Sequence, residues 1–152
     1  MDNRKIPFTK EGFANLKKEF AELTQKRKEA VISLRTAREM GDLSENAAYK
    51  VARFELGNVD RRLRRLTFLL KMAVVPTEYK SDCIVFGSKV TLTEGDKKLE
   101  FTLVSDIESN PAKKKLSFKS PIGKAILGKQ AGDKVVVNTP SGNKTFSVIS
   151  ID

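Results

Sequence analysis

The stretch Gly41-Asp42-Leu43-Ser44-Glu45-Asn46 (GDLSEN) separates two long runs of sequence with helical periodicity. Before it, apolar residues recur at alternating spacings of three and four, at Phe13, Leu16, Phe20, Leu23, Ala30, Leu34 and Ala37. The pattern resumes after it at Tyr49, Ala52, Leu56, Val59, Leu63, Leu66, Leu70 and Ala73. A heptad pattern on both sides of a short loop predicts two helices that fold back as an antiparallel two-helix coiled coil.

The register of this hairpin can also be predicted. Aligning the runs about the loop brings together Ala37 with Tyr49, Leu34 with Ala52, Leu23 with Leu63, and Leu16 with Leu70. Arg27 interrupts the first run and comes to lie beside Val59 and Asp60, so we predict an Arg27–Asp60 pair across the seam. Each helix should hold about 30 residues, roughly 45 Å at 1.5 Å per residue. We expect Thr9 to begin the first helix and Pro76 to follow the second.

The rest of the sequence indicates a small domain of different type. Strands are predicted at 83–86, 89–93, 99–104, 134–138 and 145–151, with turn signals at Gly95-Asp96 and at residues 141–143. Residues 120–128 begin with Ser-Pro and end with Gly, which predicts one short helix. The fold class is therefore α+β: residues 1–75 form the coiled-coil arm with its acidic tip at 41–46, and residues 76–152 form a small β-sheet domain.

The charge is strongly positive and unevenly shared. The 152 residues carry a net charge of +10. Residues 1–75 contribute 17 Lys and Arg against 10 Asp and Glu, a net charge of +7. This predicts a polyanionic partner or an acidic protein surface, with simple solubility as the alternative.

Several classes of protein are disfavoured by composition. With no histidine and a single cysteine, Cys83, the chain lacks the commonest general base and cannot form an internal disulfide, which suits a reducing cytoplasm. No signal peptide or membrane-spanning run is apparent. Phosphate-binding glycine loops, zinc spacings and a Ser/His/Asp set are also missing. Cys83 is expected to be a buried small residue, and Lys113-Lys114-Lys115 to be a solvated loop.

The acids of the tip admit two interpretations. In the first, Asp42 and Glu45 form a capping box, in which Asp42 caps the second helix and Glu45 reaches back. In the second, both carboxylates point outward from the end of a rod and are oxygen ligands for Mg²⁺. Two ligands are too few to hold Mg²⁺ tightly, so the tip would complete the active site of another molecule.

The second predicted helix also carries exposed basic residues. Arg61, Arg62, Arg64 and Arg65 lie off the heptad seam. Arg64 has possible partners in Asp60, one turn earlier, and in Glu22 across the seam. The remaining guanidinium groups suit recognition of phosphate or carboxylate.

Two segments of the chain resemble the bacterial transcript cleavage factors of the GreA/GreB family. They are GDLSENAAY, between the heptad runs, and SPIGKAILGKQAGDKVVVNTPSG, at residues 120–142. The residues DRRLRRLT at 60–67 and VNTPSG at 137–142 are closer to the GreB branch, whereas Leu43 is more GreA-like.

This resemblance implies a function in trans. It implies an FKBP-like second domain that docks on RNA polymerase, and an arm that enters the polymerase secondary channel. Asp42 and Glu45 would help hold an Mg²⁺ shared with the polymerase, with Ser44 assisting, so that the polymerase cleaves backtracked RNA. The chain would not itself be an enzyme and would bind no metal tightly when free. We expect a cytoplasmic monomer.

The resemblance also implies a basic patch that contacts the nascent RNA 3′ end. This patch would include Arg53, Arg61, Arg62, Arg64 and Arg65. One departure from the family pattern is Ala48, where an acid is usual, which would weaken a secondary contact of the tip.

Three other functions remain open. A Gre-like inhibitor would plug the same channel without stimulating cleavage, although such inhibitors tend to crowd more acids at the tip. A peptidyl-prolyl isomerase is suggested only by the FKBP-like fold, which is a weak analogy. A general RNA-binding arm would bind RNA tightly without polymerase.

Overall fold

A computed structural model describes residues 5–41, 46–76 and 82–152. The chain divides into two compact units. One comprises Met1–Lys5 and Lys10–Ala73, and the other comprises Ile6–Thr9 and Val74–Asp152. The short strands β1 (Ile6–Pro7) and β2 (Ala73–Val74) form a two-stranded sheet of their own.

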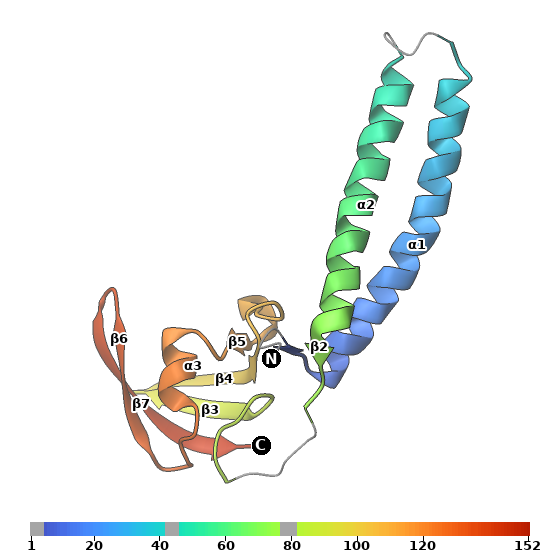
Figure 1. The fold of residues 1–152 in the computed structure, drawn as a ribbon. Helices are drawn as coiled ribbons and strands as arrows, with labels where there is room; N and C mark the ends of the chain where they lie inside the picture. The colour runs from blue at the N-terminus through green and yellow to red at the C-terminus, as the bar shows by residue number, and fades with distance from the viewer. Residues whose placement is uncertain (1–4, 42–45, 77–81) are drawn as a thin grey trace. The chain divides into compact units, whose positions relative to one another are not determined.

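The first unit is an antiparallel pair of long helices, which confirms the predicted hairpin. Helix α1 covers Lys10–Arg38, helix α2 covers Ala47–Met72, and the two lie side by side along their length (Figure 1). We call this pair the arm. Along its seam Leu16, Ala37, Ala52 and Leu66 are buried, and most other heptad positions are half-buried. Two helices alone cannot enclose a seam from every side, which explains the partial exposure.

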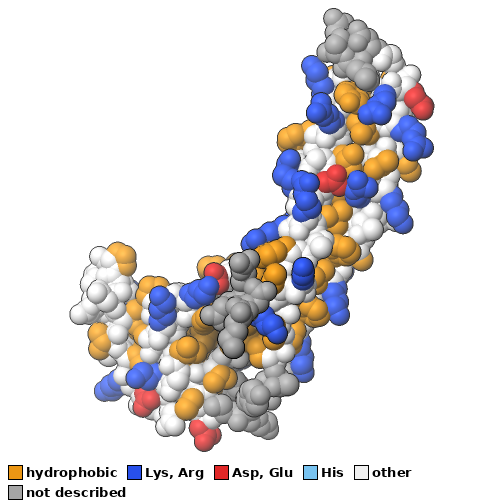
Figure 2. Space-filling view, viewed as in Figure 1, with side chains coloured by type: hydrophobic (Ala, Val, Ile, Leu, Met, Phe, Trp, Pro, Cys, Tyr) orange, Lys and Arg blue, Asp and Glu red, His pale blue; other side chains and the backbone are white. Residues whose placement is uncertain are grey.

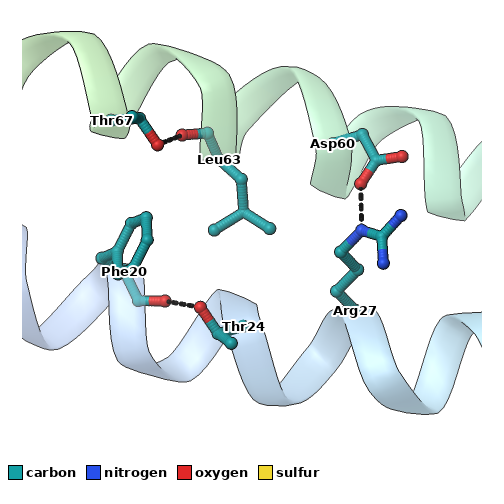
Figure 3. Close-up of polar contacts among 6 residues, drawn as sticks. All are labelled: Phe20, Thr24, Arg27, Asp60, Leu63 and Thr67. Carbon is teal, nitrogen blue, oxygen red and sulfur yellow. Dashed lines mark hydrogen bonds and ion pairs between the residues drawn. The ribbon is translucent and has the colours of Figure 1, made fainter.

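The predicted pair across the seam is confirmed. Arg27 Nε donates to Asp60 Oδ1 at 2.6 Å, at the point where the apolar repeat of α1 is interrupted (Figure 3). Both side chains are well exposed, so the pair adds only about 0.2–1 kcal/mol to stability. Its position instead favours one register, because sliding either helix would separate the charges.

Two threonines line the seam beside this pair. The hydroxyls of Thr24 and Thr67 donate to the backbone carbonyls of Phe20 and Leu63, each at 2.8 Å (Figure 3). Bonding back to their own helices satisfies both hydroxyls without a partner from the facing helix. The side chains of Phe20 and Leu63, which point into the seam from opposite helices (Figure 3), are therefore flanked by hydroxyls whose protons are already donated.

The second unit is built on a five-stranded sheet in the order β5-β4-β3-β7-β6. The strands are β3 (Lys89–Glu94), β4 (Lys97–Val104), β5 (Lys115–Ser117), β6 (Lys134–Thr139) and β7 (Gly142–Ile151). All neighbours are antiparallel except β4 and β5. The core is formed by Ile84, Val90, Leu92, Phe101, Leu103, Ile126, Val135, Val137, Phe146 and Val148.

A short helix, α3 (Pro121–Ile126), packs against β6 and contributes Ile126 to this core. Ser120 caps it as predicted, with Oγ accepting from the Gly123 amide at 3.0 Å. The same hydroxyl donates to the Ser117 carbonyl at 2.6 Å. The α+β fold class is confirmed by these elements.

Three local predictions in this unit were wrong. Residues 83–86 are not a strand, because Cys83 forms only an isolated bridge with Gln130 and the chain turns at once through Val85–Ser88. Cys83 is half-buried rather than buried. The lysine run is not a simple loop: Lys113 ends the 3-10 helix η1 (Pro111–Lys113), Lys114 adopts a left-handed conformation and Lys115 begins β5. Lys113 and Lys114 are nevertheless exposed to solvent, as predicted.

Candidate functional site

The end of the arm consists of two helix termini and the GDLSEN motif between them. Helix α1 ends at Arg38 and α2 begins at Ala47. Asp42, Ser44 and Glu45 lie outside the described residues, so their roles in metal binding and catalysis stay predictions. Gly41, with a φ of 125°, and Asn46 are the described members of the motif.

In the capping-box interpretation of the tip, the assignment of Asp42 as the cap of α2 was wrong, and the contact predicted for Glu45 lies outside the described residues. The N-cap of α2 is Asn46, not Asp42: Asn46 Oδ1 accepts from the Tyr49 amide at 3.0 Å. The Asn46 carbonyl accepts the first helical bond, from the Lys50 amide at 3.2 Å. Asn and Asp cap helices about equally well, so capping alone does not decide between them.

Asparagine differs from aspartate here because its side-chain amide can also donate a hydrogen bond. Asn46 Nδ2 donates to the carbonyl of Ala37, in the last turn of α1, at 2.6 Å. That carbonyl is one of the last four of α1, which lack the regular helical partner. Besides Asn46 it accepts only from the Met40 amide among the described residues, at 3.2 Å. An aspartate has no donor with which to make this bond. The Arg38 guanidinium also lies over the Tyr49 ring, 5.9 Å from its centroid, so a second contact joins the same two helix ends.

The five arginines of the predicted basic patch are all exposed, but they differ in their partners. Arg62 binds both carboxylate oxygens of Glu19 across the arm, at 2.6 and 2.9 Å. Hydrogen bonding to this carboxylate raises the pKa of Arg62. Arg61 donates to the side chain of Asn58 on its own helix. These two groups are therefore already engaged within the arm.

The side chains of Arg53, Arg64 and Arg65 make no hydrogen bond or ion pair with any residue that the structure describes. The predicted pairs of Arg64 with Asp60 and with Glu22 were wrong, because Asp60 faces α1 and binds Arg27 instead. Basic side chains are spread along the visible face of the arm (Figure 2). Within the described ranges, the patch arginines whose guanidinium groups have no partner are thus Arg53, Arg64 and Arg65.

No group of three or more cysteine, aspartate or glutamate side chains is placed to hold a metal ion among residues 5–41, 46–76 and 82–152. Over the same ranges, neither long helix has an apolar stretch that could cross a membrane.

Two family models of transcription elongation factors match the chain, one over the arm and one over the second unit. The N-terminal family model, "Transcription elongation factor, N-terminal", matches residues 6–75. The model "Transcription elongation factor, GreA/GreB, C-term" matches residues 79–152. The chain belongs to the GreA/GreB family of transcription elongation factors.

Two sequence relatives agree with this assignment. The transcription elongation factor GreA of Nautilia profundicola is 40% identical over 97% of this chain and 94% of the relative. The GreA of Ruegeria pomeroyi is 42% identical over 97% of each chain. A solved structure of GreA factor homolog 1 (Gfh1) from Thermus thermophilus is 29% identical, with 98% and 99% of the chains covered and a TM-score of 0.47. Since both sequence relatives, from Nautilia profundicola and Ruegeria pomeroyi, are named GreA, the prediction of the GreB branch is not supported.

Proposed function

We propose that this chain is a transcript cleavage factor that acts inside RNA polymerase. The arm would enter the polymerase secondary channel and carry Asp42 and Glu45 to the active site, while the second unit docks on the polymerase. The observation that carries the proposal is the arm itself: its helices end at Arg38 and begin at Ala47, on either side of GDLSEN. Membership of the GreA/GreB family supports it independently.

The chemistry of the tip fits a magnesium ion shared with the polymerase. Carboxylate oxygens are the ligands that Mg²⁺ prefers, and Mg²⁺ usually takes only one or two of them from a protein. Together with the polymerase's own metal ion, the shared Mg²⁺ would help to stabilise both the attacking and the leaving oxygen of the phosphodiester. Asp42 and Glu45 would complete its coordination, and Ser44 would assist at the tip. Asn46 supports this assignment, because it supplies the helix cap that the capping-box interpretation gave to Asp42.

The three arginines without a partner among the described residues are suited to contacting the RNA. Arg53, Arg64 and Arg65 would contact the 3′ end of the backtracked RNA through its phosphates. Arg61 and Arg62 would contribute less to this contact, because their donors are already bound to Asn58 and Glu19. The proposal further includes action as a cytoplasmic monomer.

The test is RNA cleavage in a purified, stalled elongation complex. We expect wild-type chain to shorten the RNA from its 3′ end, and Asp42→Ala or Glu45→Ala to reduce the rate at least about a hundredfold, as loss of a pre-positioned electrostatic group does elsewhere. Glu39→Ala is the matched control, since it removes an exposed carboxylate next to the tip but outside GDLSEN.

Polymerase binding should survive in all three variants. Cleavage by either tip variant at the wild-type rate would refute the proposal. Slower nucleotide addition by the wild type, without any shortening of RNA, would identify a channel-plugging inhibitor instead.

A further inference from the structure

Asn46 joins the two helices of the arm through both polar atoms of one side chain. Its Oδ1 accepts from the Tyr49 amide at the start of α2, and its Nδ2 donates to the Ala37 carbonyl at the end of α1. We call these two bonds the Asn46 clasp. The Nδ2 bond closes the chain between positions nine residues apart, and this closed segment contains GDLSEN.

The clasp is attached at a fixed point on each side. Ala37 is 4% exposed and therefore packed against the seam, and its carbonyl also accepts from the Met40 amide at 3.2 Å. On the other side Asn46 begins the helical bonding of α2, since its carbonyl accepts from Lys50. The bond from Asn46 Nδ2 to the Ala37 carbonyl therefore fixes the distance between the end of α1 and the start of α2, not the distance between two loops.

We infer that Asn46 is a positioning residue for the tip carboxylates: the clasp fixes the two helix ends from which the chain enters and leaves residues 42–45. This inference rests on the proposed function. Its physical basis is the narrow tolerance of Mg²⁺, which demands near-ideal octahedral geometry. A misplacement of about 1 Å in a catalytic group can cost about a hundredfold in rate. Closing the segment also removes conformations that two untied helix ends could adopt.

The substitution Asn46→Ser should remove the bond to Ala37 while keeping the cap of α2. Serine is as good an N-cap as asparagine, so the start of α2 should be preserved. Its hydroxyl is too short to keep both bonds, so the link to Ala37 is lost. Asn110→Ser is the matched control, because Asn110 also caps a helix with its side chain, accepting from the Ala112 amide at 3.1 Å in the second unit.

The first measurement is the cleavage rate in stalled elongation complexes as a function of Mg²⁺ concentration. For Asn46→Ser we expect unchanged helicity, polymerase affinity within about twofold, and a rate about tenfold lower at limiting Mg²⁺. High Mg²⁺ should recover part of this loss, which a merely destabilised arm would not show. Asn110→Ser should follow the wild-type curve. A wild-type curve for Asn46→Ser would overturn the inference.

The second measurement tests the clasp without polymerase. Spin labels at Glu39→Cys and Lys50→Cys, both exposed sites, would be placed in a Cys83→Ser background. Asn46→Ser should broaden the distance distribution between the labels, and an unchanged distribution would overturn the inference. If the wild type itself fails to stimulate cleavage, the proposed function fails; the distance distribution then decides separately whether the clasp orders the helix ends.

Discussion

At the scale of single residues, two helical glycines of this chain have opposite surroundings. A Cβ added to Gly123 would lie 2.3 Å from the Ser117 carbonyl oxygen and 2.8 Å from the Phe118 Cα. These are backbone atoms, so α3 itself would have to move. A Cβ added to Gly57 would meet only the end of the Arg61 side chain, at 3.6 Å. The first glycine is therefore required by close packing and the second is not.

We predict that Gly123→Ala destabilises the second unit by about 1–3 kcal/mol, the usual cost of overpacking a core. Gly57→Ala is the matched control and should stabilise the arm by up to about 1 kcal/mol, because alanine is the better helix former. Urea unfolding followed by circular dichroism measures both changes. Equal and small effects of the two substitutions would contradict the packing argument.

At the scale of elements, the sequence predicted the two long helices, which depend on a repeated apolar pattern. It missed the cap of α2 and strand β5, which depend on a few individual contacts. The heptads specified α1, α2 and the Arg27–Asp60 pair, since a pattern repeated over many residues tolerates local exceptions. The cap of α2 was misplaced because the choice of Asn46 depends on the Ala37 carbonyl, which belongs to another helix. Strand β5 was missed because it is only three residues long.

For the candidate site, the sequence predicted which arginines are exposed but not which residues they bind. The exposed arginines could be located from the heptad seam, because residues off that seam face solvent. Their partners could not, since the bond between Arg62 and Glu19 depends on the relative rotation of two helices. A local signal for Asn46 did exist: an asparagine directly before Ala47-Ala48 fits the preferences of an N-cap.

Which arginines of the arm form ion pairs within it can be tested directly. We predict a coupling energy of about 0.5 kcal/mol between Glu19 and Arg62 in a double-mutant cycle of alanine substitutions, because both side chains are partly exposed. The matched cycle is Glu22 with Arg64, the pair that the sequence suggests and the structure lacks, and its coupling should be zero within error. Urea unfolding of the arm gives both values, and the reverse ranking would contradict the observed pairing.

At the scale of the whole molecule, the effect of the net charge of +10 on RNA binding differs from the effect of the few side chains that can bind phosphate directly. Net charge raises encounter rates with any polyanion, but counterion release depends on the phosphates actually neutralised. Arg53, Arg64 and Arg65 are the patch members without a partner among the described residues. A protein with three such contacts should bind free RNA weakly and with a modest dependence on salt.

For single-stranded RNA we therefore predict that log K falls against log salt with a slope of about −2, which is 0.7 per phosphate for three contacts. The double substitution Arg64→Ala/Arg65→Ala should reduce the slope to about −0.7, because one contact is left. The control Lys124→Ala/Lys129→Ala removes the same charge from exposed sites in the second unit and should leave the slope near −2. Fluorescence anisotropy between about 50 and 200 mM salt measures all three. If both double variants lowered the slope equally, net charge alone would govern binding, and the arm would have no RNA-contacting patch.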